Sequence, residues 1–243
     1  MAKQSIKIAL LGYGKMGKTI DRLATADGHE IVLKIDKDNL SDLTPENLGR
    51  ADVAIEFSQP DSAFGNIIAC IESGVPVVSG TTAWLDRLEE AKAMVEKHQG
   101  ALFYASNYSV GVNIFFALNR QLARIMNAHS EYAVDMVEIH HTQKLDAPSG
   151  TAITLAEGLI GELKSKRGWV EGREAEDNEI RIVSEREGMV PGTHIVNYRS
   201  EVDTITIRHE AHSREGFARG AILAAEWIVG KQGFFGMPDL LGF

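Results

Sequence analysis

Two adjacent histidines, a lysine and a helix-start signal lie within the short segment 138–152. The imidazoles of His140 and His141 can exchange protons near neutral pH. Lys144 adds a full positive charge, and Pro148 fixes one backbone angle just before a serine of the type that caps helices. These residue types at this spacing suit proton transfer beside a bound anion.

The neighbouring sequence predicts that this segment is a strand-to-helix loop. The apolar run 133–139 is typical of a strand. Apolar positions after the loop repeat at helical spacing: Ile153, Leu155, Ala156, Leu159 and Ile160. A rigid scaffold holds such loops in place, so they often carry chemistry. If Ser149 caps the helix, the free N–H groups of Gly150, Thr151 and Ala152 will hold a carboxylate or phosphate.

A glycine loop near the start of the chain predicts a dinucleotide site. Gly12-Tyr13-Gly14-Lys15-Met16-Gly17 follows a predicted strand, 6–11, and opens a predicted helix, which is the context that the fingerprint G-x-G-x-x-G requires. Asp36 ends the second strand, where an acid accepts the ribose hydroxyls of NADH. Lys37 is its neighbour and is placed to contact the 2′-phosphate of NADPH. We therefore expect both cofactors to be used.

Two further loops follow predicted strands of the same sheet. Gly80-Thr81-Thr82 comes after the strand 75–78, and Ala105-Ser106-Asn107-Tyr108 comes after the strand 101–104. Ligands of open parallel sheets bind at the carboxyl ends of strands. By themselves, these residues are more typical of ordinary turns.

The order of predicted elements indicates an α/β fold with two domains. Strands alternate with helices, at about 60–73 and 85–98, over the first hundred residues, which implies a parallel sheet of the Rossmann type. After a long helix at 112–126 the pattern changes to an α+β domain with an open mixed sheet. Its predicted strands are 133–139, 180–185, 194–200 and 204–208, and a polar stretch covers 165–178. A final amphipathic helix is predicted at 214–229.

From this order we expect a dinucleotide-binding domain made of residues 1–109 plus 213–243. Residues 110–212 would form a second domain, which carries the loop within 138–152; the resemblance described below implies that this domain binds the substrate and joins subunits.

Composition narrows the class of protein. The net charge of −9 argues against nucleic-acid or anionic-membrane partners, and the 44% apolar content is ample for a core. The single cysteine, Cys70, cannot form an internal disulfide, which favours a reducing cytoplasmic location. The start of the chain has no signal-peptide pattern, and no apolar run is long enough to span a membrane.

The segment His140-His141-Thr142-Gln143-Lys144-Leu145-Asp146-Ala147-Pro148-Ser149-Gly150-Thr151-Ala152 resembles the signature of the dihydrodipicolinate reductase family. The resemblance extends to Gly80-Thr81-Thr82, to Ala105-Ser106-Asn107-Tyr108-Ser109 and to the stretch 209–214, so it covers most of the chain. It implies reduction of 4-hydroxy-tetrahydrodipicolinate to tetrahydrodipicolinate by NADH or NADPH, with loss of water. This step belongs to lysine and diaminopimelate biosynthesis.

The resemblance also implies roles for particular residues. His140 and Lys144 would be catalytic, with either one able to supply the proton. Substrate carboxylates would be bound by His141, Ser149, Gly150 and Thr151. The loops at 80–82 and 105–108 would border the nicotinamide end of the cofactor, and the second domain would join subunits into a homotetramer.

Two other classes of protein remain as alternatives. A zinc hydrolase could use His140, His141 and a third histidine. Adjacent residues of an extended segment point to opposite faces, however, and the chain lacks both H-E-x-x-H and a cysteine pair. A dinucleotide-sensing regulator without catalysis would use the glycine loop, but would leave Lys144 and Ser149 without a role.

Overall fold

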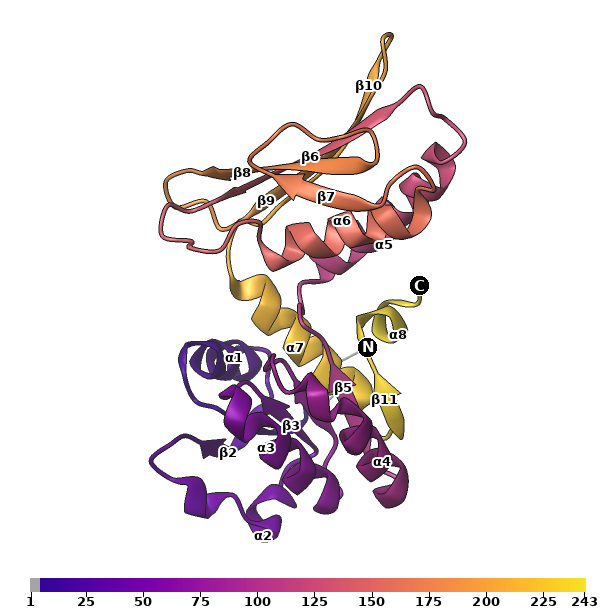
Figure 1. Cartoon of the computed structure of the whole chain (residues 1–243). Helices are drawn as coiled ribbons and strands as arrows, with labels where there is room; N and C mark the ends of the chain where they lie inside the picture. The colour runs from indigo at the N-terminus through magenta and orange to yellow at the C-terminus, as the bar shows by residue number, and fades with distance from the viewer. Residues whose placement is uncertain (1–4) are drawn as a thin grey trace. The chain divides into compact units, whose positions relative to one another are not determined.

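A computed structural model describes residues 5–243, which form two compact units. The first unit comprises residues 1–110 and 215–243, and the second comprises residues 111–214. Each unit has its own sheet (Figure 1). Among the described residues, no helix is both long and apolar enough to cross a membrane.

The first unit is built on a six-stranded parallel sheet in the order β11-β5-β4-β3-β1-β2. Its strands are β1 (Lys7–Leu11), β2 (Glu30–Ile35), β3 (Val53–Glu56), β4 (Val77–Ser79), β5 (Ala101–Tyr104) and β11 (Gly233–Phe235). Its helices are α1 (Lys15–Ala26), α2 (Pro45–Leu48), α3 (Pro60–Glu72), α4 (Leu88–His98), α7 (Glu215–Ile228) and α8 (Met237–Leu241), with short 3-10 turns η1 (Leu40–Asp42) and η2 (Leu85–Arg87).

Both faces of this sheet are buried because its strands are apolar on both sides. Along β1, Ile8 and Leu10 pack on the face covered by α1 and α7. Ala9 and Leu11 pack on the opposite face, which is covered by α3 and α4. This is the arrangement expected of parallel strands joined by helical crossovers. All the carboxyl ends therefore lie at one edge of the sheet.

The second unit has a mixed five-stranded sheet in the order β10-β9-β6-β8-β7. Its strands are β6 (Ala133–His140), β7 (Gly168–Glu171), β8 (Glu179–Arg186), β9 (Thr193–Arg199) and β10 (Thr204–Glu210). β6 runs parallel to β8 and antiparallel to β9. The helices α5 (Val110–Met126) and α6 (Gly150–Glu162) cover one face of this sheet, where they enclose the unit's core (Figure 1).

The predicted fold class, a Rossmann-type parallel sheet followed by an α+β domain with an open mixed sheet, is confirmed. The differences lie in short elements. The polar stretch 165–178 contains the strand β7, and the chain adds β11 and α8 after the last predicted helix. Both strands are short edge strands whose conformation depends on a neighbour, so neither has a periodic pattern of its own. The helix predicted at 85–98 begins as the turn η2 and becomes α-helical at Leu88.

Candidate active site

β6 determines which way the catalytic candidates point. Burial alternates along this strand, so Glu138 and His140 lie on its buried face. His141 follows immediately after the strand and is partly exposed. The two histidines therefore face different surroundings, as expected for neighbours on an extended segment.

Ser149 caps α6 and is itself buried. Its hydroxyl accepts a hydrogen bond from the N–H of Ala152 at 3.2 Å and lies 3.2 Å from Nε2 of His194. The Ser149 hydroxyl therefore caps the start of α6 and already has polar partners, Ala152 and His194. Among the described residues, none accepts a hydrogen bond from the amide N–H of Gly150 or Thr151. These two amides are the free donors at the positive end of the helix.

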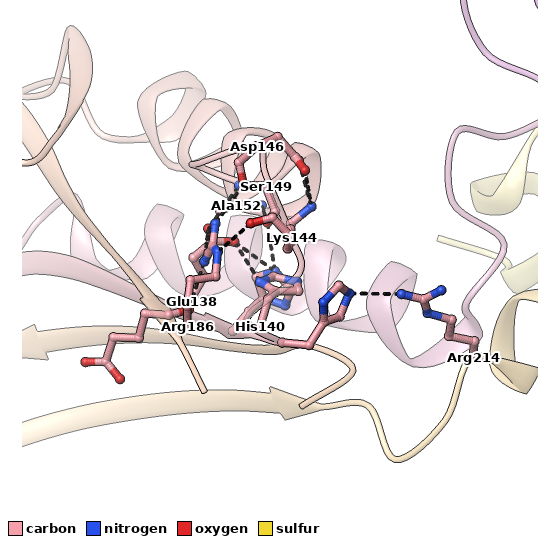
Figure 2. A network of polar contacts seen from close by, with 11 residues as sticks. Glu138, His140, Lys144, Asp146, Ser149, Ala152, Arg186 and Arg214 are labelled. Atoms are coloured by element: carbon pink, nitrogen blue, oxygen red, sulfur yellow. Dashed lines mark hydrogen bonds and ion pairs between the residues drawn. The ribbon is translucent and has the colours of Figure 1, made fainter. Parts of the chain in front are cut away.

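Glu138 is a fully buried carboxylate at the centre of the polar network in Figure 2. Its Oε1 accepts a hydrogen bond from the N–H of Ser149 at 3.1 Å and lies 3.4 Å from the guanidinium of Arg186. Its Oε2 lies 3.2 Å from Nδ1 of His140. Burial raises the pKa of Glu138, but the contacts with His140 and Ser149 outweigh it and lower the pKa to about 2. Glu138 is therefore a fixed negative charge at neutral pH.

Arg186 connects Glu138 to the loop that follows β6. Its guanidinium donates hydrogen bonds to the backbone carbonyls of Asp146, at 2.7 Å, and Lys144, at 3.4 Å. Figure 2 shows this side chain between Glu138 and the loop. Arg186 thereby holds in place the backbone that carries Lys144.

Lys144 is held by its near neighbour Asp146. Its Nζ donates to both carboxylate oxygens of Asp146, at 2.8 and 2.6 Å. The Lys144 side chain is 19% exposed and that of Asp146 is 64% exposed. The amine is therefore oriented beside solvent, where an incoming carboxylate can compete with Asp146.

His141 pairs with Arg214, which is the last residue of the second unit and is labelled in Figure 2. Their side chains meet at 3.0 Å, between His141 Nε2 and an Arg214 guanidinium nitrogen. Arginine has no acceptor, so Nε2 of His141 must be the unprotonated acceptor in this contact. Nδ1 of His141 then carries the ring's proton and is its available donor.

One group of described side chains has the spacing of metal ligands. It consists of Glu138, His140 and His194, whose ligand atoms lie within 4.8 Å of one another. The guanidinium of Arg186 already provides a cation beside Glu138, and a metal ion there would face a second positive charge. The zinc-hydrolase alternative paired His140 with His141 as metal ligands. The structure instead groups His140 with Glu138 and His194, and His141 contacts Arg214.

The glycine loop has the geometry that its sequence predicts. Gly12 has a φ of +98°, and a Cβ there would lie 2.1 Å from the carbonyl oxygen of Phe57. A Cβ on Gly17 would lie 2.2 Å from the carbonyl oxygen of Gly12, whereas a Cβ on Gly14 would meet nothing within 4 Å. The space beside Gly14 is thus open to a phosphate, and α1 begins there without a side-chain cap.

A pocket of about 260 Å³ adjoins this loop in the first unit. Its lining includes Tyr13, Asp36, Lys37 and Asn66 in addition to the glycines. Asp36 and Lys37 are both exposed. The pocket therefore places an acid and a base where the sequence predicts the adenosine ribose.

The loop 80–82 lies beside the same edge of the sheet. A pocket of about 300 Å³ is lined by Met16, Gly80, Thr81 and Thr82, among others. A Cβ on Gly80 would lie 2.1 Å from the ring of Phe57, so the loop approaches that ring closely. Met16 and the two threonines thus share one lining with the glycine loop's helix.

The side chains of the loop 105–108 differ in burial. Tyr108 is buried, and its hydroxyl donates to the carbonyl oxygen of Ser79 at 2.7 Å. Ala105 is also buried, while Ser106 is exposed and Asn107 accepts a hydrogen bond from the N–H of Ser109. Tyr108 therefore supports the loops from the core, and Ser106 is the member of the loop with a free surface.

The chain matches two protein-family models over almost its whole length. The model described as "Dihydrodipicolinate reductase, N-terminus" matches residues 6–108, and the one described as "Dihydrodipicolinate reductase, C-terminus" matches residues 111–241. The chain belongs to the dihydrodipicolinate reductase family. Family membership confirms the resemblance inferred from the sequence and identifies a nicotinamide dinucleotide as the cofactor.

Individual relatives agree with this family assignment. A curated 4-hydroxy-tetrahydrodipicolinate reductase from Christiangramia forsetii is 49% identical over 240 residues, 97% of this chain and 98% of the relative. One from Methanosarcina barkeri is 37% identical and covers 95% of this chain and 83% of the relative. A solved structure, "Dipicolinate bound Dihydrodipicolinate reductase from Paenisporosarcina sp. TG-14", has a TM-score of 0.78 at 23% identity, covering 97% of this chain and 99% of that one, and shows the same fold.

Four side chains of these networks were given no role from the sequence. They are Glu56, Arg186, His194 and Arg214. Glu56 left a signal, because an acid within the apolar run 53–57 has to find buried partners. Arg186 and His194 reach the site from distant strands, so no local pattern marks them, and Arg214 lies in the stretch 209–214, which the resemblance covers without assigning this residue a role.

Proposed function

We propose that this chain reduces 4-hydroxy-tetrahydrodipicolinate to tetrahydrodipicolinate and releases water. Its curated relatives carry the name 4-hydroxy-tetrahydrodipicolinate reductase. The substrate carries two carboxylates on a small heterocycle. One loop of the second unit offers a buried imidazole, a lysine and two free helix-start amides, and this combination carries the proposal. It supplies an anion site and a proton donor side by side.

Residues of the second unit take the substrate roles. The free N–H groups of Gly150 and Thr151 bind a carboxylate, Lys144 adds charge by exchanging Asp146 for the substrate, and His141 donates through Nδ1. Ser149 shapes this site through its cap. When bound, the dinucleotide supplies the hydride. The proton that follows comes from Nε2 of His140 or from Nζ of Lys144, which balances the reduction.

Residues of the first unit take the cofactor roles. The loop from Gly12 to Gly17, with Tyr13, Lys15 and Met16 between the glycines, binds the pyrophosphate at the start of α1. Asp36 accepts the ribose hydroxyls of NADH, and Lys37 contacts the 2′-phosphate of NADPH, so both cofactors are used. The loops at 80–82 and 105–108 border the nicotinamide.

The assembly we propose is a homotetramer joined through the sheets of the second unit. β10 is an edge strand whose side chains are largely exposed, including Ile205 at 37%. Such a surface favours pairing or packing between copies. Light scattering at micromolar concentration should give four times the chain mass, and a monomer mass would rule this assembly out. We place the enzyme in the cytoplasm, where its single free cysteine, Cys70, is expected to stay reduced.

Loss of NADH absorbance, with the substrate generated in place, tests the reaction. The reductase oxidises NADH only when the substrate is present. A dinucleotide-sensing regulator, the alternative function, would bind NADH without oxidising it. Tight NADH binding with no oxidation would therefore overturn the proposal in favour of the regulator.

A further inference from the structure

The buried carboxylate of Glu138 joins the two halves of the proposed substrate site. One oxygen faces the imidazole of His140, and the other accepts from the first residue of the helix-start motif, Ser149. We propose that Glu138 is a positioning residue for the reductase reaction. It orients His140 as a proton donor and holds the start of α6 where the substrate carboxylate binds. The inference rests on the proposed role of His140.

Glu138 fixes the orientation of the His140 ring. Its Nδ1 and Oε2 of Glu138 are both buried, and neither forms a hydrogen bond with any other described residue. They lie 3.2 Å apart, while Nε2 of His194 is 3.9 Å from the same oxygen; the hydroxyl of Ser184, opposite Glu138 on β8, also helps to lower the pKa of this carboxyl. Directing the Nδ1 proton at Glu138 satisfies both atoms. Nε2 is then the nitrogen of His140 that remains for the substrate.

The side of the ring that carries Nε2 is kept open by a glycine. A Cβ on Gly192 would lie 3.0 Å from Nε2 of His140 and 3.3 Å from the ring's Cδ2. Any larger residue would crowd the nitrogen that we assign to proton donation. Glu138 on one side and Gly192 on the other therefore define one orientation of the ring.

Charged and titratable side chains surround Glu138 and His140. The titratable or charged groups facing Glu138 and His140 are Arg186 on β8, His194 on β9 and Lys144 on the loop, with His209 on β10 beyond His194. Burial, reinforced by the charge of His140, lowers the pKa of His194 to about 4, so His194 is neutral at pH 7. Glu138 is thus the negative charge nearest the imidazole of His140.

Glu138 also holds the start of α6. Besides accepting from Ser149, Glu138 anchors Arg186, which holds the carbonyls of Lys144 and Asp146. Loss of the carboxylate would therefore release the loop as well as the ring. An amide at this position could still accept from Ser149 through its oxygen. Glutamine should separate the two effects, and alanine should combine them.

The central test compares Glu138→Gln with Asp135→Asn. Asp135 lies on the same strand and has its own partners, Arg199 and Asn197, outside this network. We expect Glu138→Gln to lower kcat roughly 10-fold or more, which is less than the roughly 10²- to 10⁴-fold that a general acid itself contributes, because His140 is still present. Binding of pyridine-2,6-dicarboxylate should change less than about 3-fold in Glu138→Gln but fall clearly in Glu138→Ala. Asp135→Asn should match the parent in every measurement.

Two controls separate this inference from the proposed function. If His140→Ala keeps its turnover, the role of His140 itself is wrong. If His140→Ala loses turnover while Glu138→Gln keeps kcat within about 2-fold, only the positioning role is wrong. ¹⁵N NMR of the unsubstituted protein tests the same inference without relying on a substituted protein that folds correctly. A protonated Nδ1 on His140 at neutral pH supports the inference, and a neutral ring with the proton on Nε2 overturns it.

Discussion

The hydroxyl of Thr81 donates to the carboxylate of Glu56 at 2.8 Å, and both residues are buried. The same carboxylate accepts from the Ser79 hydroxyl at 2.7 Å and from the N–H of Ser58 at 2.9 Å. A hydrogen bond from the Ser58 hydroxyl completes the set. Glu56, at the end of β3, therefore holds the loops that follow β3 and β4 in one arrangement beside the cofactor pockets.

Glu56→Gln should weaken NADH binding about tenfold, because a glutamine oxygen cannot serve all these donors and its NH₂ would oppose some of them. Fluorescence titration with NADH measures this. Ser73→Ala is the control, because it removes a hydroxyl hydrogen bond at the far end of α3, to the carbonyl of Ala69. Equal losses in the two variants would mean that Glu56 acts only on general stability.

Lys144→Ala should lower turnover by roughly 10²-fold or more, because it removes both a charge and a possible proton donor beside the helix start. NADH affinity should barely change. Lys164→Ala, at an exposed lysine just past the other end of α6, should match the parent in steady-state kinetics. Near-normal turnover in Lys144→Ala would remove Lys144 from the catalytic pair.

Lys37→Ala should weaken NADPH more than NADH, since only NADPH carries the 2′-phosphate that this exposed side chain would meet. Dissociation constants for both cofactors, measured on the same preparation, give the comparison. Lys97→Ala, at an exposed position in α4, controls for the lost surface charge. An equal loss for NADH and NADPH would show that Lys37 does not reach the phosphate.

Thr151→Pro should raise the Michaelis constant for the substrate roughly tenfold to a hundredfold, the range for losing a hydrogen bond to a charged group. Proline is tolerated in the first turn of a helix, and circular dichroism checks the fold. Thr151→Ala keeps the backbone N–H and should stay near the parent. If pyridine-2,6-dicarboxylate binds a folded Thr151→Pro protein as tightly as the parent, the carboxylate lies elsewhere.

The free energy of unfolding should fall in acid, and part of the decrease should come from protonation of the Glu138 carboxylate. The folded-state pKa of this carboxyl is about 2, below its ordinary 4.5. Its contribution to the free energy of unfolding is therefore complete above about pH 4.5 and is lost as the pH falls toward 2. Urea unfolding across this range should show the difference between the parent and Glu138→Gln shrinking with pH. A constant difference would contradict the ionised, network-bound state of Glu138.

The order of elements and the chemistry of single loops were predictable from the sequence because both depend on local patterns. The glycine loop needs only a strand before it and a helix after it, and both follow from the spacing of apolar residues. The cap at Ser149 and the opposite orientations of His140 and His141 are likewise local consequences of helix and strand geometry.

Tertiary structure alone decided which side chains lie behind those loops. The register of the second sheet places Glu138 opposite His194 on β9, and His140 opposite Arg186 on β8. Strand pairing sets these neighbours, and a shift of one residue would turn each side chain to the other face. The sequence alone determined that a strand, a loop with an amine and imidazoles, and a capped helix follow one another. Only the folded sheet decided that a buried carboxylate, a clamping arginine and a neutral histidine surround them, because strands distant in sequence form that sheet.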